Sequence, residues 1–303
     1  MRVAAIDVGT NSTRLLVAEE QDAGFRSLDR RMIITRLGQG VDSRRILAPD
    51  ALERTLSVIA DYAAICGEYE VERLRVTGTS AVRDAHNREE FFDGVRRLTG
   101  HEPELLTGDQ EATATFLGAC SELDRDEPKL VVDIGGGSTE FIVGTEVPDR
   151  MISIDIGCVR MLEKFLHSDP PTPEEIAAMR ENVDGELKRV KDALDPPQGA
   201  RLIGVAGTVT QLATLKAGLP VYDPDVTHHA VLSHGDVRRL ARRLTSLPFA
   251  QRKQVKALEP GRVDVIVPGA HILMYVMEAF DAAEVLVSEK DILDGLVIQL
   301  LDA

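Results

Sequence analysis

Short apolar runs separated by polar turns give the first half of the chain a mixed strand and helix pattern. Pro49 opens the longest helix of this half, which presents Leu52, Leu56 and Ile59 on one face. A turn is expected at 22–24, between two strands. The pattern predicts strands at 2–8, 13–19, 25–36, 73–77 and 104–106, and helices at 49–69, 87–98 and 107–120.

The second half repeats this order of elements after an acidic, proline-containing stretch at 121–128. That stretch is the best linker in the sequence, and it predicts two domains, 1–122 and 123–303. The second domain is expected to have extra helices, with the option that its final helix packs back on the first domain. Residues 220–233 read as irregular, and a basic helical region is expected to run to about 258. Strands are predicted at 129–135, 138–145, 150–156, 201–206 and 284–287, and helices at 158–166, 173–194, 208–217, 236–245, 264–280 and 291–301.

Two loop motifs recur in the same order, which indicates an internal duplication. Residues 7–17 read D-V-G-T-N-S-T-R-L-L-V, and 133–143 read D-I-G-G-G-S-T-E-F-I-V. V-T-G-T-S-A at 76–81 likewise matches V-A-G-T-V-T at 205–210. Two related domains are therefore expected to face each other across a cleft, with strand-end loops from both converging on one ligand.

The triple-glycine turn within 130–143 suits an anion. Three adjacent glycines leave their amides accessible to phosphate, and Ser138 adds a hydroxyl donor. Asp133 and Glu140 flank the turn, and carboxylates beside phosphate donors suit a hard cation. A tight hairpin whose glycines only satisfy turn geometry is the structural alternative.

The composition of the chain argues against some classes of binding partner and indicates a cellular compartment. The net charge is −15 and aromatic residues make up 4% of the chain, which argues against general nucleic-acid or membrane binding. The three cysteines are far apart and suit a reducing compartment. Because the first apolar run is broken at Asp7, no signal segment is expected, and the location is expected to be cytoplasmic.

These motifs resemble the phosphate loops of the actin, Hsp70 and sugar-kinase superfamily. G-T-S-A-V-R-D-A-H-N at 78–87, G-D-Q-E-A at 108–112, G-x-x-R at 157–160 and A-G-T-V-T-Q-L-A at 206–213 are similar to the exopolyphosphatase and guanosine pentaphosphate phosphatase (Ppx/GppA) family, in its short two-domain form. The resemblance implies an α/β fold of two duplicated actin-like (ribonuclease H-like) domains, each with a mixed five-stranded sheet flanked by helices. It also implies a homodimer. S-E-K-D-I-L-D-G-L at 288–296 departs from the family pattern, which puts a phosphate contact there in doubt.

The resemblance places the catalytic glutamate at Glu111, where a carboxylate can accept a proton from the attacking water. A glutamate stabilised by a helix N-terminus is the structural alternative. Asp133 and Glu140 suit Mg2+, or else Mn2+, and Asp7 holds either the cation or a water. Glu140 orienting the attacking water, and Asp7 accepting hydrogen bonds from loop amides, stay open.

Neutral phosphate donors and arginines complete the expected site. Arg14 stands where the repeat has Glu140, so one half offers a cation and the other a carboxylate. Arg83 is a second expected phosphate clamp, because a guanidinium fork grips phosphate well, and it joins Glu111 and Glu140 in the catalytic set. The expected phosphate-binding residues are Asn11, Ser12, Arg14, Gly135, Gly136, Gly137, Ser138, Gly207, Thr208 and Arg262.

The segment 236–262 is basic within an acidic chain, and it serves either to steer a polyanion or as a solvated helix face. His228, His229 and His234 lack a partner set at ligand spacing, so no zinc site is expected. The predicted activity is release of terminal orthophosphate from inorganic polyphosphate, and the close alternative is removal of the 5′ γ-phosphate of pppGpp. A superfamily kinase or ATPase and a non-enzymatic phosphate sensor are the competing classes.

Overall fold

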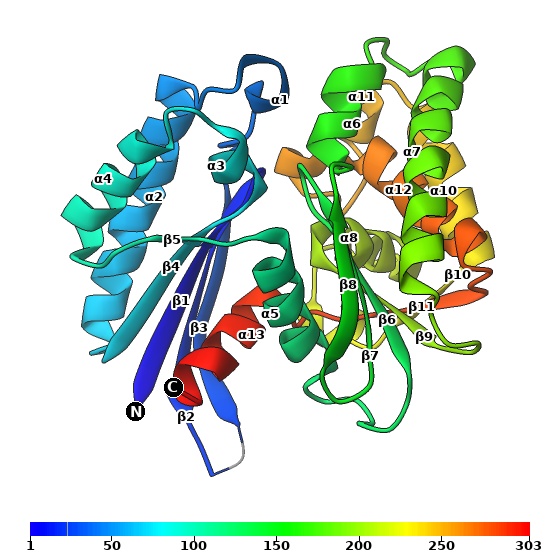
Figure 1. Ribbon diagram of the computed structural model, residues 1–303. Helices are drawn as coiled ribbons and strands as arrows, with labels where there is room; N and C mark the ends of the chain where they lie inside the picture. The colour runs from blue at the N-terminus through cyan, green and yellow to red at the C-terminus, as the bar shows by residue number, and fades with distance from the viewer. Residues whose placement is uncertain (23) are drawn as a thin grey trace. The chain divides into compact units, whose positions relative to one another are not determined.

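The computed structural model describes residues 1–22 and 24–303, which form two compact units (Figure 1). Unit 1 comprises Met1–Ser121 and Asp291–Ala303, and unit 2 comprises Glu122–Lys290. The C-terminal segment therefore belongs to the same unit as the N-terminus. The turn predicted at 22–24 includes residue 23, which lies outside the described residues.

The sheet of unit 1 has the strand order β3-β2-β1-β4-β5. β1 and β2 pair antiparallel, whereas β1, β4 and β5 run parallel, so the sheet is mixed as expected. β1 is apolar almost throughout and buried, as expected for a central strand covered on both faces. The strands are β1 (Arg2–Val8), β2 (Ser12–Glu20), β3 (Phe25–Ile34), β4 (Arg73–Gly78) and β5 (Glu104–Leu105).

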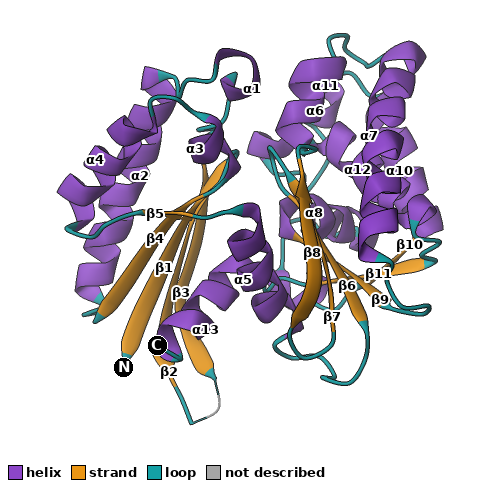
Figure 2. Ribbon diagram, in the orientation of Figure 1, coloured by secondary structure: helices purple, strands orange, loops and turns teal. Residues whose placement is uncertain are grey.

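Two layers of helices cover this sheet (Figure 2). α2 (Pro49–Glu68) and α4 (Arg88–Thr99) pack with the side chains of one sheet face, which include Ile6, Leu15 and Val76. α5 (Gly108–Cys120) and α13 (Ile292–Leu301) pack against the other face. The short helices α1 (Val41–Arg44) and α3 (Ser80–Asp84) were not separately predicted, since a single turn leaves little periodic signal.

α5 and α13 approach each other closely through glycine. A Cβ on Gly295 would collide with the carbonyl oxygen of Ala114, and a Cβ on Gly118 would collide with that of Asp291. Glycine at both positions removes the side chains that would otherwise separate the two backbones. This contact holds the C-terminal helix against the unit that contains the start of the chain.

The sheet of unit 2 has the order β10-β11-β9-β6-β7-β8 and therefore six strands, not the five expected. The extra strand lies within 220–233, which the sequence analysis wrongly took as irregular. Only three residues long, it pairs antiparallel with β11 and is too short to show alternation. The strands are β6 (Lys129–Ile134), β7 (Thr139–Gly144), β8 (Pro148–Ile154), β9 (Arg201–Val205), β10 (Val231–Ser233) and β11 (Glu284–Val287).

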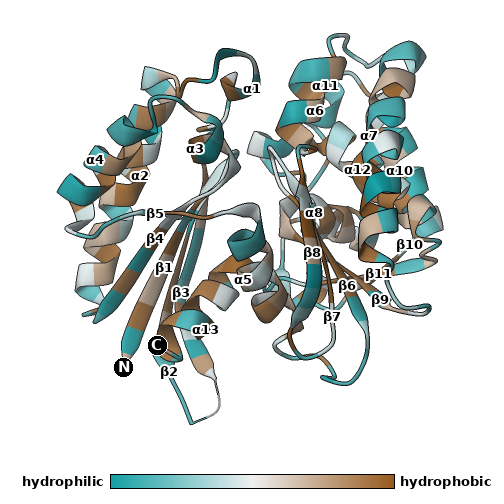
Figure 3. Ribbon diagram, viewed as in Figure 1, coloured by the Kyte–Doolittle hydropathy of each residue, from teal (hydrophilic) through white to brown (hydrophobic). Residues whose placement is uncertain are grey.

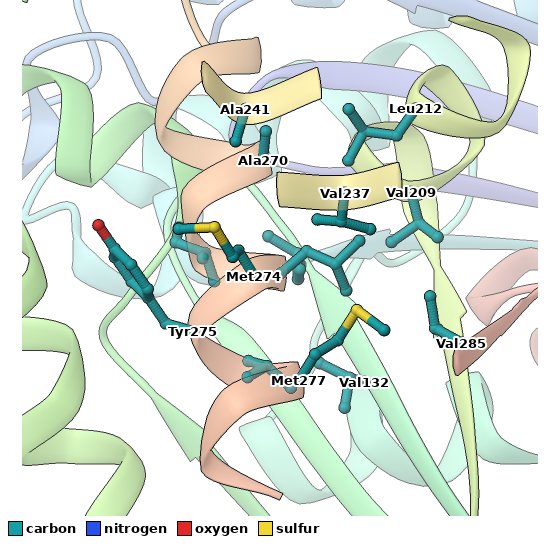
Figure 4. Packing of buried hydrophobic residues seen from close by; sticks show 14 of the residues in the cluster. Val132, Val209, Leu212, Val237, Ala241, Ala270, Met274, Tyr275, Met277 and Val285 are labelled. Carbon is teal, nitrogen blue, oxygen red and sulfur yellow. The ribbon is translucent and has the colours of Figure 1, made fainter. Parts of the chain in front are cut away.

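The helices of unit 2 enclose a large apolar core, in which α12 is central (Figure 4). Met274 and Met277 of that helix lie among side chains from the sheet, such as Val132, and from α10, such as Val237. Figure 3 shows the apolar residues concentrated on the strands and a polar surface along α4 of unit 1. The helices are α6 (Cys158–Phe165), α7 (Pro173–Leu194), α8 (Ala206–Ala217), α9 (Pro224–Thr227), α10 (His234–Ser246), α11 (Phe249–Arg252), the 3-10 turn η1 (Pro260–Arg262) and α12 (Ile266–Ala279).

The basic region after α10 differs from the expectation. α11 is a single turn ending at Arg252, so continuous helix to 258 is wrong. Pro248 precedes α11, and proline disfavours helix in the residue before it, which separates α11 from α10. In the part of the chain that the structure describes, no helix combines the length and apolarity that a membrane crossing needs.

His271 is a buried histidine in the core of unit 2. Its Nε2 lies 2.9 Å from Thr245 Oγ1 and its Nδ1 lies 3.0 Å from Tyr275 Oη. Burial, with a smaller contribution from the nearby Arg180 charge, lowers the pKa of His271 to about 4. The imidazole is therefore neutral in the folded protein at pH values where an unfolded histidine is protonated.

Because of His271, the free energy of unfolding is expected to decrease as the pH falls from 6.5 to 4. In that window the unfolded chain takes up a proton that the folded chain excludes, which amounts to about 2 kcal/mol at pH 5. Urea unfolding of His271→Gln at pH 7 and pH 5 should show a smaller loss than the wild type. The exposed His101→Gln is the control, and an unchanged pH slope in His271→Gln would disprove the assignment.

Candidate active site

Two strand-turn-strand loops have the same geometry in the two units. In unit 1 the register places Asp7 opposite Arg14, and in unit 2 it places Asp133 opposite Glu140. The first glycine of each turn donates its amide to a serine carbonyl, Gly9 to Ser12 and Gly135 to Ser138, both at 3.0 Å. The duplication read from the sequence therefore extends to individual hydrogen bonds.

In unit 1, the Asn11 backbone is fixed by its neighbours. Its carbonyl accepts the amides of Thr35 and Arg36 at 3.1 and 2.9 Å. Its side-chain Nδ2 is buried and has no hydrogen-bond partner among residues 1–22 and 24–303. A buried amide donor without an acceptor is costly, and a phosphate oxygen would satisfy it. Asn11 thus fits its expected role, with Ser12 next to it at the start of β2.

Arg14 is held by two carboxylates of unit 1. Its guanidinium bonds Asp7 Oδ2 at 2.6 and 3.1 Å and also pairs with Asp291. Burial raises the pKa of Asp7, although the Arg14 charge opposes this. In this structure Arg14 neutralises Asp7, so a contact between Arg14 and phosphate would require exchange of an ion pair.

The ion-pair network continues to Arg30 and Asp294, and the sequence analysis missed it. Arg30 bonds both carboxylate oxygens of Asp294 at 2.6 Å, and Asp291 caps the N-terminus of α13. Burial raises the pKa of Asp294. The only signal in the sequence was the departure from the family pattern at 288–296. The return of the final helix to the first domain was allowed for, but not the pairing of these acids with Arg14 and Arg30.

Glu111 lies in the first turn of α5, and the helix start is well defined. Thr107 Oγ1 accepts the Gln110 amide at 3.2 Å, and Gln110 Oε1 accepts the Thr107 amide at 2.9 Å. Thr107 and Gln110 together form a capping box. Glu111 is 8% exposed, and its Oε2 accepts a hydrogen bond from Arg83 at 3.2 Å. The predicted base and the predicted clamp are thus direct neighbours.

Arg83 is itself oriented by the backbone. The Nη1 of Arg83 also donates to the Leu106 carbonyl at 2.8 Å. Arg83 lies in α3, the single helical turn that follows β4. A guanidinium held by one carbonyl and one carboxylate has further donors for a phosphate oxygen. The pair therefore combines a carboxylate that can accept a proton with a cation beside it.

In unit 2, the triple-glycine turn is fastened through its carbonyl groups. The Gly136 carbonyl accepts the amides of Val159 and Arg160 at 2.8 and 3.1 Å, and Arg160 Nε donates to the Gly137 carbonyl at 2.7 Å. A Cβ on Gly157 would collide with Gly136, so this position requires glycine. The sequence analysis noted this G-x-x-R motif without assigning Arg160 a role, and the structure shows that it fixes the loop.

Asp133 and Glu140 are neighbouring buried carboxylates at the ends of β6 and β7. Glu140 Oε1 accepts a hydrogen bond from Ser153 Oγ at 2.7 Å, which orients it. Two acids side by side in a buried position favour a cation between or beside them, and oxygen donors suit a hard divalent ion. The donor set of this structure therefore fits a hard divalent cation at Asp133 and Glu140.

The start of α8 brings the A-G-T loop to Arg262. Gly207 faces the guanidinium of Arg262 so closely that a Cβ there would overlap it. Thr208 lies against Gly269 of α12 in the same way. Ala206 adopts φ 66°, a left-handed conformation uncommon for alanine, at the junction of β9 and α8. Gly207, Thr208 and Arg262 thus form one cluster.

The predicted residues are divided between the two units. Unit 1 holds Asp7, Asn11, Ser12, Arg14, Arg83 and Glu111, and unit 2 holds Asp133, Gly135, Gly136, Gly137, Ser138, Glu140, Gly207, Thr208 and Arg262. Polar loops follow equivalent strands in both units, at the end of the sheet where α/β proteins bind ligands. The fold and these loops define the class of duplicated, actin-like phosphate-binding proteins, as expected.

The chain belongs to the Ppx/GppA phosphatase family, whose model matches residues 16–303. It is 38% identical to the protein named exopolyphosphatase 2 of Mycobacterium tuberculosis, over 99% of this chain and 98% of that protein. The crystal structure of the Aquifex aeolicus family member has a TM-score of 0.85 and 33% identity, covering 100% of this chain and 98% of that one. A guanosine-5′-triphosphate,3′-diphosphate pyrophosphatase of Vibrio parahaemolyticus is 24% identical over 99% of this chain and 59% of its own length.

Proposed function

We propose that this protein is an exopolyphosphatase, which releases terminal orthophosphate from inorganic polyphosphate. The observation that supports this most directly is the pairing of Glu111 with Arg83 at 3.2 Å, in a chain that also has two phosphate-type loops. A carboxylate base beside a phosphate-binding cation suits hydrolysis better than a binding function alone. The relative named exopolyphosphatase 2, which matches almost end to end, adds to the case.

In the proposed reaction, a water oxygen attacks the terminal phosphorus as Glu111 accepts its proton. The phosphorus–oxygen bond to the next phosphate breaks, and the bridging oxygen leaves with the shortened chain. Arg83 stabilises negative charge on the terminal phosphate oxygens. Asn11 and Ser12 of unit 1, and the triple-glycine turn of unit 2, are proposed to donate hydrogen bonds to phosphate oxygens.

Asp133 and Glu140 are proposed to hold Mg2+, and Mn2+ would suit the same oxygen donors. When bound, the ion would offset charge on the phosphate oxygens. Ser153 orients Glu140 through a 2.7 Å hydrogen bond, so this carboxylate is positioned before substrate arrives. Asp7 contributes less directly in this proposal, because Arg14 already neutralises it.

Hydrolysis of the 5′ γ-phosphate of pppGpp uses the same chemistry and is the second candidate. The family includes a relative named for a guanosine substrate, at 24% identity. The local excess of basic residues at 236–262 favours a long polyanion, and the low aromatic content disfavours a tight purine pocket.

Initial rates of phosphate release with Mg2+ distinguish these substrates. Long-chain polyphosphate, tripolyphosphate and pppGpp are compared at equal concentrations of cleavable ends. The proposal expects kcat/KM for long-chain polyphosphate to exceed that for pppGpp by at least about tenfold. A preference for pppGpp would assign the second function, and transfer of phosphate from ATP to a sugar would overturn both.

A further inference from the structure

The segment 236–262 of unit 2 has a charge opposite to that of the whole protein. It contains eight basic and two acidic residues, in a chain whose net charge is −15. Three parts of the structure share it: α10, α11 and the turns that lead to η1. Such a local reversal of sign attracts polyanions and orients them.

A groove of about 660 Å3 lies within this basic region. Its polar lining consists of Arg243 from α10, Lys256 from the following turns, and the two glutamines Gln251 and Gln254. The apolar lining includes Leu215 and Leu219 at the end of α8 and Val255. Apolar walls of this kind accommodate the stems of arginine and lysine while the charged ends face the groove.

The polar side chains of the groove are not used within the protein. Among the residues that the structure describes, the side chains of Arg243, Gln251, Gln254 and Lys256 form no hydrogen bond or ion pair. Their basic neighbours differ, since Arg239 pairs with Asp236 at 2.5 Å and Arg252 with Asp169 at 3.2 Å. Among the described residues Arg238 and Arg242 of α10 are also without an ion pair but do not line the groove, so Arg243 and Lys256 are its unpaired cations.

The turn that follows Lys256 joins the groove lining to Arg262, one of the proposed phosphate-binding residues. Gln211 of α8 donates to the Ala257 carbonyl at 2.7 Å and accepts the Glu259 amide at 3.0 Å, which fixes the turn after Lys256. That turn leads to Arg262, which faces Gly207. Along α8, Thr208 and Leu215 are about 10 Å apart, by the rise of a helix.

We propose that this groove is a second anion site, which holds phosphates of a long polyphosphate chain remote from the cleaved end. The inference rests on the proposed exopolyphosphatase function. Two cations and two amides around one hollow suit a chain of phosphates, each with negative charge and acceptor oxygens. The groove makes binding depend on chain length in this proposal, because only a chain that continues well beyond the cleaved end can occupy it.

The charge-reversed Arg243→Glu/Lys256→Glu variant tests this against Arg238→Glu/Arg242→Glu as matched control. The control reverses the same charge on exposed residues of α10 that do not line the groove. The groove variant should raise KM for long-chain polyphosphate by about tenfold or more, and leave KM for tripolyphosphate and kcat unchanged. Its KM should also depend less steeply on salt, because fewer phosphate contacts remain.

Binding of long-chain polyphosphate is measured separately in a Glu111→Gln background, with single-stranded DNA as competitor. Loss of binding in the groove variant alone supports the site even if the wild type releases no phosphate, an outcome that would overturn only the proposed function. Equal losses in the control, equal effects on tripolyphosphate, or unchanged binding would overturn the groove. Competition by DNA as effective as by polyphosphate would also overturn it, since the site would then not select phosphate chains.

Discussion

Replacing Glu111 by Gln is expected to lower kcat for phosphate release by about a thousandfold, with little change in KM. Gln keeps the size of the side chain and can still contact Arg83, but its amide cannot accept a proton from water. Glu111 is only 8% exposed and its carboxylate lies 3.2 Å from Arg83, whereas Asp109, the other acid in the first turn of α5, is exposed. Steady-state phosphate release from polyphosphate measures the effect.

Asp109→Asn is the matched control, since it removes one carboxylate from the same first turn of α5 at an exposed position. The control should retain kcat within about twofold, since an exposed charge at a helix start contributes little to the reaction. Circular dichroism and thermal unfolding establish that both variants fold. Wild-type kcat in a folded Glu111→Gln protein would remove Glu111 from the role of base.

Much of the fold could be predicted because the same order of strands, loops and helices occurs twice in the sequence. The repeats at 7–17 and 133–143 predicted equivalent strand pairs, and the structure pairs Asp7 with Arg14 and Asp133 with Glu140 in the same register. Long periodic elements such as α2 and α7 were found for the same reason that they are stable, since each buries a continuous apolar face. The sixth strand of unit 2 was missed, because three residues carry no readable period.

The chemistry around the loops was less predictable, because it depends on contacts between distant residues. Nothing near Arg14 in the sequence indicates that Asp291 would pair with it, since their contact requires α13 to pack on α5. Arg160 could be noted as a motif but not as the residue that fixes the Gly137 carbonyl. Sequence patterns identified the candidate site residues. Tertiary packing determined which of their charges are paired within the protein, as the charge of Arg14 is with Asp7 and Asp291.

Replacing Asp133 by Asn is expected to raise the Mg2+ concentration for half-maximal activity by about 10- to 100-fold. Asp133 lies opposite Glu140, another acid, so loss of one carboxylate removes charge from a paired oxygen site. Asp7→Asn serves as the comparison. Since Arg14 neutralises Asp7 at 2.6 Å, that change should alter the Mg2+ requirement by less than about fivefold.

Asp7→Asn and Asp133→Asn should also differ in thermal stability. Asp7→Asn removes a carboxylate that is bonded to Arg14 and should lower Tm. Asp133→Asn relieves repulsion between two acids and should preserve or raise Tm without metal. Calorimetric titration with Mn2+ measures the metal affinity independently of turnover. An equal loss of Mn2+ affinity in both variants would contradict this prediction. Asp7 would then be a metal ligand, and its ion pair with Arg14 would have to break when the metal binds.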